Sequence, residues 1–168
     1  VMPDEQPQQV EQHHAAGRAA QMFHNLLVQN GYVVLDMDYR ASKGYGVKWR
    51  TAIYRQMGHP ELEDYLDGVN WMVVNQQGDA SNVSIYGGSY GGYMVNMIAG
   101  KWNGPWRCLV NHAGVFDVPQ LMNAMDISTF IHEFGGATWD RKAVYDEHNP
   151  ETYAGDWKKP STASPRWS

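Results

Sequence analysis

Hydrophobic residues in this 168-residue chain follow two kinds of spacing, which alternate along the sequence. Helical spacing, with apolar residues three or four positions apart on one face, marks three segments: 16–29, 60–78 and 93–102. Short apolar runs, typical of strands in a parallel sheet, mark three others: 31–40, 82–87 and 106–112. The pattern therefore predicts an α/β fold, with a mostly parallel sheet and helices on both faces.

Local signals support these boundaries. Asn30-Gly31 is expected to end the first helix, and Pro60 suits the first turn of the second. Glu61 and Glu63, which follow Pro60, complement the positive end of a helix. Apolar residues on one face of this helix form its predicted buried stripe: Leu62, Tyr65, Leu66, Val69 and Met72.

The rest of the chain is less regular. Residues 1–15 are polar and Gln-rich, and we expect a disordered or foreign leader there. Residues 40–58 are typical of a long surface connection, and the segment from 113 onward shows turns and short helical stretches. We therefore expect one domain over 16–160, followed by an irregular tail over 161–168.

Charge and cysteine content exclude several classes of protein. The net charge is −5 and we find no run of Lys or Arg, which argues against nucleic acid or an anionic membrane as partner. The apolar stretches are shorter than a membrane span. Cys108 has no second cysteine to pair with, so an internal disulfide is excluded and a cytoplasmic location is slightly favoured. The sequence determines neither the compartment nor the oligomeric state. The position of Cys108 in the middle of a predicted strand indicates that this residue is buried and packs like a small apolar side chain.

One short motif carries chemistry. Residues 87–91, Gly-Gly-Ser-Tyr-Gly, match G-x-S-x-G and lie between a predicted strand and a predicted helix. In this nucleophile elbow the serine sits on a sharp, strained turn, and small neighbours let the strand and helix approach each other. Ser89 is therefore a candidate nucleophile, and the backbone N–H of Tyr90 is a candidate donor to an oxyanion.

Several stretches in the same order resemble the prolyl oligopeptidase family of serine peptidases. The stretch GGSYGGYM resembles the family's nucleophile segment, and LVNHAGVFD resembles the strand and loop that follow it. Upstream, GYVVLDMDYRASKGYG resembles a strand and its loop, and ELEDYLDGVNWM resembles the helix before the nucleophile strand. The resemblance implies an α/β-hydrolase fold and hydrolysis of short peptides or acylated amino acids by a Ser-Asp-His triad, with no metal or other cofactor. It assigns Ser89 as nucleophile and Tyr90 to the oxyanion hole, and expects Val115 and Phe116 to line the acyl pocket.

The sequence also departs from the family's pattern. Ala41 stands where the family has a glycine, and we find neither the catalytic acid nor the histidine at a matching position. A family strand that would lie between 31–40 and 82–87 is also not found, so strand edges are expected to be left unpaired. The resemblance thus implies an incomplete α/β-hydrolase domain that is inactive alone. A carboxylesterase on the same fold and a non-catalytic interaction module remain alternatives.

Other residues near the motif have plainer interpretations. His112 is the nearest candidate base, but a histidine at a strand end is more often bonded to backbone or solvent. His132 and His148 are interpreted as surface residues in irregular segments. Asp117 is expected to cap the segment that follows it, and Arg40 to form a structural salt bridge rather than to bind a substrate carboxylate.

Overall fold

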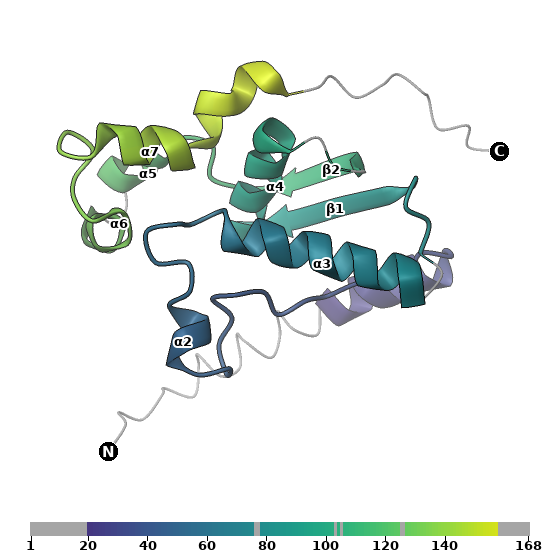
Figure 1. The fold of residues 1–168 in the computed structure, drawn as a ribbon. Coiled ribbons are helices and arrows are strands. Elements are labelled where there is room, and N and C mark those ends of the chain that lie inside the picture. Colours follow the sequence, from purple (N-terminus) through teal and green to yellow (C-terminus); the bar gives the residue numbers. More distant parts are fainter. Residues whose placement is uncertain (1–19, 76–77, 103, 105, 125–126, 158–168) are drawn as a thin grey trace. The chain divides into compact units, whose positions relative to one another are not determined.

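In the computed structural model the chain is divided into two compact units, and the division falls between Asp36 and Met37 along the sequence. The structure describes residues 20–75, 78–102, 104, 106–124 and 127–157, with the backbone alone at 127–129 (Figure 1). The predicted leader over 1–15 and tail over 161–168 lie outside the described residues.

The first unit contains the predicted first helix, over residues 20–29. It ends where the sequence indicated, because Gly31 adopts a positive φ of 82° and the Asn30 side chain donates a hydrogen bond to the Leu26 carbonyl at 2.8 Å. The predicted strand over 31–40 is wrong: residues 32–39 form neither helix nor strand, and Tyr32 and Val33 are exposed. A strand needs a hydrogen-bonded neighbour, and the described sheet contains only two strands, both from the second unit.

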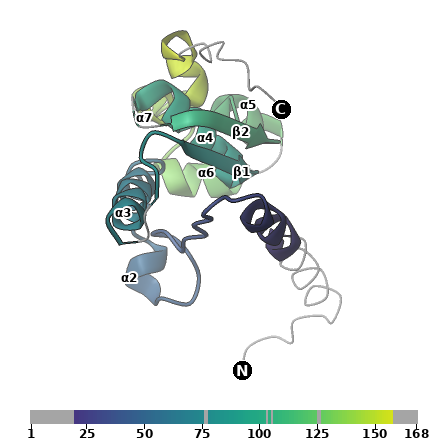
Figure 2. The same ribbon diagram turned by 90° about the vertical axis from the view of Figure 1, so that its right-hand side faces the viewer.

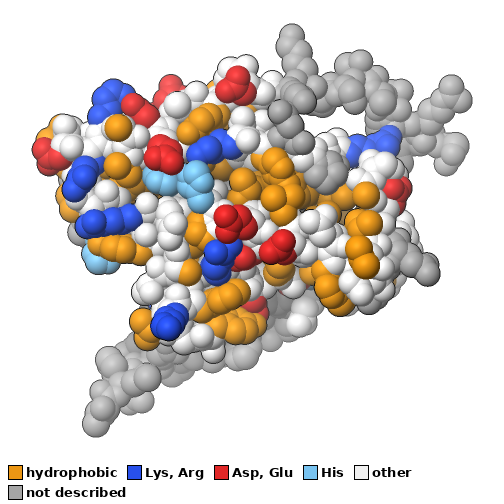
Figure 3. Space-filling model, viewed as in Figure 1, with side chains coloured by type: hydrophobic (Ala, Val, Ile, Leu, Met, Phe, Trp, Pro, Cys, Tyr) orange, Lys and Arg blue, Asp and Glu red, His pale blue; other side chains and the backbone are white. Residues whose placement is uncertain are grey.

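In the second unit, a long connection leads to the predicted second helix. This connection contains the short helix α2 (Val47–Arg50), and α3 (Pro60–Asn75) follows it. The predicted stripe of α3 is half-buried rather than buried, while Trp71 and Val74 on the same helix are exposed. Figure 3 shows hydrophobic side chains reaching the surface on this face of the molecule, between charged side chains of both signs.

The sheet consists of two parallel strands joined by a helix. β1 (Val83–Gly88) pairs with β2 (Trp106–His112), and α4 (Tyr90–Lys101) connects them and packs against both (Figure 2). Tyr86 and Val110 lie opposite each other in the register and are both exposed. Cys108 is exposed as well, so its predicted burial is wrong. The reason is that successive side chains of β2 alternate between its two faces, and Leu109 takes the more buried side next to Cys108.

Short helices follow β2, as the sequence indicated. They are α5 (Val118–Ala124), α6 (Ile127–Phe134), α7 (Lys142–His148) and the 3-10 helix η1 (Pro150–Asp156). The hydrophobic core forms where these helices meet α4, and it contains Tyr93, Met94, Met97, Val118, Met122, Phe134 and Tyr145. None of the helices in the described part of the chain is long and apolar enough to cross a bilayer.

Candidate active site

Ser89 is the single residue between β1 and α4. Its backbone has φ 54° and ψ −114°, a region that residues with a Cβ rarely adopt. Two backbone hydrogen bonds hold it there: the Ser89 N–H donates to the His112 carbonyl at 3.1 Å, and the Ser89 carbonyl accepts from the Tyr93 N–H at 3.0 Å. The structure thus has the strained strand-to-helix turn that the G-x-S-x-G motif predicts.

Two close approaches explain why glycines surround the serine. A Cβ added to Gly87 would lie 2.4 Å from the carbonyl carbon of Gly91, and one added to Gly92 would lie 2.5 Å from the Cα of Gly114. Neither pair can separate without moving α4 away from β1 or away from the loop after β2. The glycines therefore permit the tight packing that presents Ser89 at the carboxyl end of the sheet.

Tyr90 begins α4, so its backbone N–H has no acceptor within the helix. This N–H directly follows the serine, which is the position of an oxyanion-hole donor in a nucleophile elbow. The Tyr90 side chain is directed inward, where its hydroxyl donates a hydrogen bond to Glu61 and its ring lies 5.3 Å from that of Tyr93. Burial, together with the nearby Glu61 carboxylate, raises the pKa of Tyr90, which keeps the phenol protonated.

An apolar cavity of about 220 Å³ lies beside the elbow. Its lining comes from the loop before α3, from α4 and from the segment after β2: Met57, Tyr90, Tyr93, Val115, Val118, Phe130 and Glu133. Val115, the first of the two predicted pocket residues, is in this lining. Phe116 is not; its ring packs 5.6 Å from that of Trp157 and it is partly exposed.

Two asparagines that the sequence interpretation missed fix the loop carrying Val115. Asn111 donates from Nδ2 to Asn96 Oδ1 at 2.6 Å and accepts from the Gly114 N–H at 2.8 Å. Asn96 is buried and donates to the Val115 carbonyl at 3.0 Å. These bonds satisfy polar groups beside the core and hold Val115 against α4. No spacing in the sequence marks this pair.

The described residues do not complete a triad around Ser89. His112 is exposed, and its contact with Ser89 is the backbone hydrogen bond given above. Among the described histidine, aspartate and glutamate side chains, none forms a hydrogen bond with the Ser89 hydroxyl. Asp117 caps α5, as predicted, by accepting from the Gln120 N–H at 3.0 Å.

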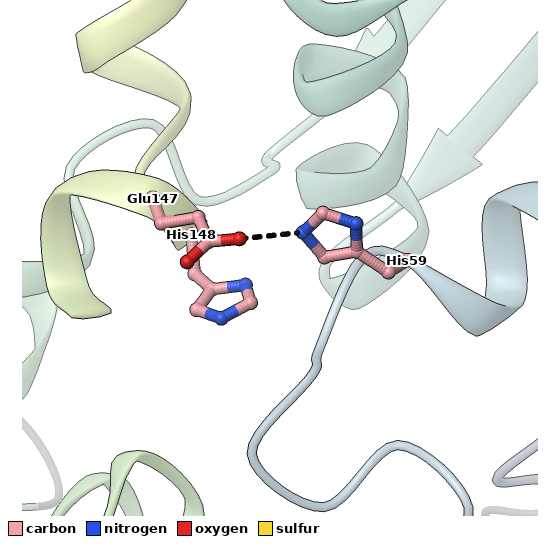
Figure 4. A group of neighbouring side chains, drawn as sticks. All are labelled: His59, Glu147 and His148. Atoms are coloured by element: carbon pink, nitrogen blue, oxygen red, sulfur yellow. Dashed lines mark ion pairs between the residues drawn. The ribbon is translucent and has the colours of Figure 1, made fainter.

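A second cluster of titratable groups lies where the loop before α3 meets the end of α7. His59, Glu147 and His148 point toward one another (Figure 4), with His59 Nε2 3.5 Å from Glu147 Oε1. His148 is buried, so its predicted surface position is wrong; its Nδ1 lies 2.7 Å from the Met57 carbonyl. Lys101 Nζ lies 3.2 Å from His59 Nε2. This ammonium group already occupies one side of the cluster, which therefore holds the loop to α4 and α7.

His132 is exposed as predicted, although it belongs to α6 rather than to an irregular segment. Arg40 forms the structural salt bridge that the sequence suggested. Its guanidinium donates to Asp64 at 2.9 Å, to Glu63 at 2.7 Å and to the Pro60 carbonyl at 2.6 Å. The hydrogen bonds to Asp64 and Glu63 raise the pKa of Arg40. These contacts anchor the connection to the start of α3.

A model of the prolyl oligopeptidase family matches residues 20–163. The chain belongs to this family. Dipeptidyl-peptidase 5 of Schizosaccharomyces pombe is 32% identical over 133 residues, which are 77% of this chain and 20% of that protein. The human acylamino-acid-releasing enzyme is 28% identical over 127 residues, 76% of this chain and 17% of that enzyme.

Solved structures confirm the fold. Acylaminoacyl peptidase of Pyrococcus horikoshii superposes with a TM-score of 0.63 at 21% identity, over 71% of this chain and 20% of that one. The fold is therefore a partial α/β-hydrolase fold, as the resemblance implied. The chain spans about one fifth of the length of the curated relatives named here.

Proposed function

We propose that this chain carries the nucleophile of a serine peptidase, with Ser89 attacking the carbonyl carbon of a peptide bond. The strained backbone of Ser89 at the junction of β1 and α4 is the observation that carries the proposal. Such strain persists where function requires it, because any residue with a Cβ pays for this conformation in stability. The Tyr90 N–H, unused within α4, would donate to the oxyanion that forms during the attack.

The cavity beside the elbow favours a substrate whose acyl side chain is apolar. Its accessible surface is apolar, although Glu133 belongs to the lining, and Val115 and Tyr90 form part of it. Two matched relatives are named dipeptidyl-peptidase 5 and acylamino-acid-releasing enzyme. Those names favour short peptides or acylated amino acids as the substrate class. Phe116 lies outside this lining, so of the two residues expected from the resemblance only Val115 is proposed to contact the substrate.

Residues 1–168 alone are expected to turn over little or no substrate. A serine hydroxyl is a weak nucleophile until a general base lies within hydrogen-bonding reach, and no described histidine provides one for Ser89. The base and its acidic partner would have to come from outside the described residues. For the chain by itself, this observation favours the alternative of a non-catalytic interaction module.

Hydrolysis of N-acetyl-L-phenylalanine p-nitroanilide and of the matching p-nitrophenyl ester tests whether residues 1–168 activate Ser89 by themselves. We expect neither substrate to react faster with the wild-type chain than with Ser89→Ala. Anilide hydrolysis that Ser89→Ala lacks would show a base inside the chain and contradict the expected inactivity. Ester hydrolysis alone, again dependent on Ser89, would favour a carboxylesterase.

A further inference from the structure

Glu61 is a fully buried carboxylate beside the elbow, with no exposed surface. Its place in the first turn of α3 predicts an exposed charge that complements the helix end, and the structure places it inside instead. Glu61 Oε1 accepts a hydrogen bond from the Tyr90 hydroxyl, and Oε2 accepts one from the Gly58 N–H at 3.0 Å. Burial raises the pKa of Glu61.

These two hydrogen bonds reach two separate segments that contribute to the cavity lining. Tyr90 lines one side, and Met57, the residue before Gly58, lines another. Tyr90 also carries the backbone N–H that follows Ser89. One side chain thus binds both a tyrosine of the cavity lining and the residue that follows Met57 in that lining.

Packing alone does not account for a carboxylate at this position. Burying an ionisable group costs free energy, and a protein with a well-packed apolar side chain at such a position is often as stable or more stable. The neighbouring acidic residues of α3 have a different role, since Glu63 and Asp64 bind Arg40 away from the cavity. Among the described acidic residues, Glu61 is the one that accepts a hydrogen bond from the Tyr90 hydroxyl.

We propose that Glu61 is a positioning residue, which holds Tyr90 and the Met57–Gly58 loop so that the cavity keeps the shape that accepts an apolar acyl side chain. The use of the cavity for substrate rests on the proposed function. The same hydrogen bonds keep the start of α4 in place, and with it the Tyr90 N–H.

Binding of N-acetyl-L-phenylalanine amide to the 15N-tyrosine-labelled chain tests this role without any chemistry at Ser89. The reporter is the backbone amide resonance of Tyr93, which lines the cavity. We expect Glu61→Leu to weaken binding about tenfold or more, the effect of losing a buried hydrogen bond to a carboxylate. Glu61→Gln keeps one acceptor oxygen for the Gly58 N–H, and its NH2 group can donate to the Tyr90 hydroxyl oxygen, so it should bind within about threefold of the wild type. Glu63→Gln is the matched control and should leave binding unchanged.

The Tyr90→Phe variant completes a double-mutant cycle. If Glu61 acts through Tyr90, the double variant Glu61→Leu/Tyr90→Phe binds no more weakly than Glu61→Leu alone. If Glu61→Leu does not fold, Tyr90→Phe decides, because it removes only a hydroxyl and should still weaken binding about threefold.

Three results would overturn the inference: wild-type affinity in a folded Tyr90→Phe or Glu61→Leu variant, strictly additive effects in the cycle, or no saturable binding to the wild-type chain. Binding of the probe requires no reaction at Ser89. Failure of this inference therefore leaves the nucleophile assignment intact, and failure of that assignment leaves the binding result intact.

Discussion

Replacing Ser89 with glycine should stabilise the protein, although it removes the proposed nucleophile. At φ 54° and ψ −114° a residue with a Cβ is strained by about 1–3 kcal/mol, and glycine relieves that strain. The greater conformational freedom of glycine stabilises the unfolded chain by about 0.5–1 kcal/mol, which offsets part of the strain relief in the folded state. The expected net increase in the free energy of unfolding is therefore about 0.5–2 kcal/mol.

Ser89→Ala is the matched control for this prediction. Alanine keeps the Cβ and so keeps the strain, while the lost hydroxyl has no hydrogen-bond partner among the described residues. Urea unfolding followed by tryptophan fluorescence should therefore place Ser89→Ala within about 0.5 kcal/mol of the wild type and Ser89→Gly above both. In a thermal scan, each kcal/mol corresponds to about 2–4 °C. A Ser89→Gly variant no more stable than Ser89→Ala would refute the strain argument.

Further predictions concern strain, packing and pH. Ala41 has φ 96°, so Ala41→Gly should raise the free energy of unfolding by about 1 kcal/mol in the same urea assay, and a loss of stability would contradict the assigned conformation. Gly87→Ala should lower the free energy of unfolding by roughly 2–3 kcal/mol, because its Cβ would clash with Gly91. Gly155→Ala is the control and should change stability little, because the space around the added carbon is open. Equal effects of the two substitutions would contradict the close packing of the elbow. Burial lowers the pKa of His148 below the value of about 6.5 expected in the unfolded chain. The unfolded chain thus binds more protons there, so stability should fall as pH drops below about 7, and His148→Gln should reduce this slope between about pH 7 and 5. An unchanged slope would show that His148 is not buried in its neutral form.

Local geometry explains which features the sequence could predict. The elbow depends on residues within five positions of one another, and steric limits on Gly87 and Ser89 act whatever the rest of the fold does. The helix end at Gly31 and the cap at Asp117 are local in the same sense. Features of this kind can be read from a single sequence.

Burial and strand pairing depend on residues far away in the chain. The run at 31–40 has the composition of a buried strand, yet a strand forms only where a neighbour offers hydrogen bonds. The exposure of Cys108 and the burial of His148 were mispredicted for the same reason, since each depends on what covers it. Glu61 was missed because its contact with Tyr90 spans 29 positions and leaves no local pattern.

We infer that Ser89 lies in a formed nucleophile elbow for which no described residue supplies a base. Intact-mass analysis of fluorophosphonate labelling tests it most directly, on folded wild-type and Ser89→Ala chains, with and without added imidazole as an external base. We expect no adduct without imidazole and a Ser89-dependent adduct with it. A Ser89-dependent adduct without imidazole would place the base inside this chain, and His112 would be tested next. Equal labelling of the two chains, or none with imidazole present, would contradict the assignment of Ser89 as the nucleophile.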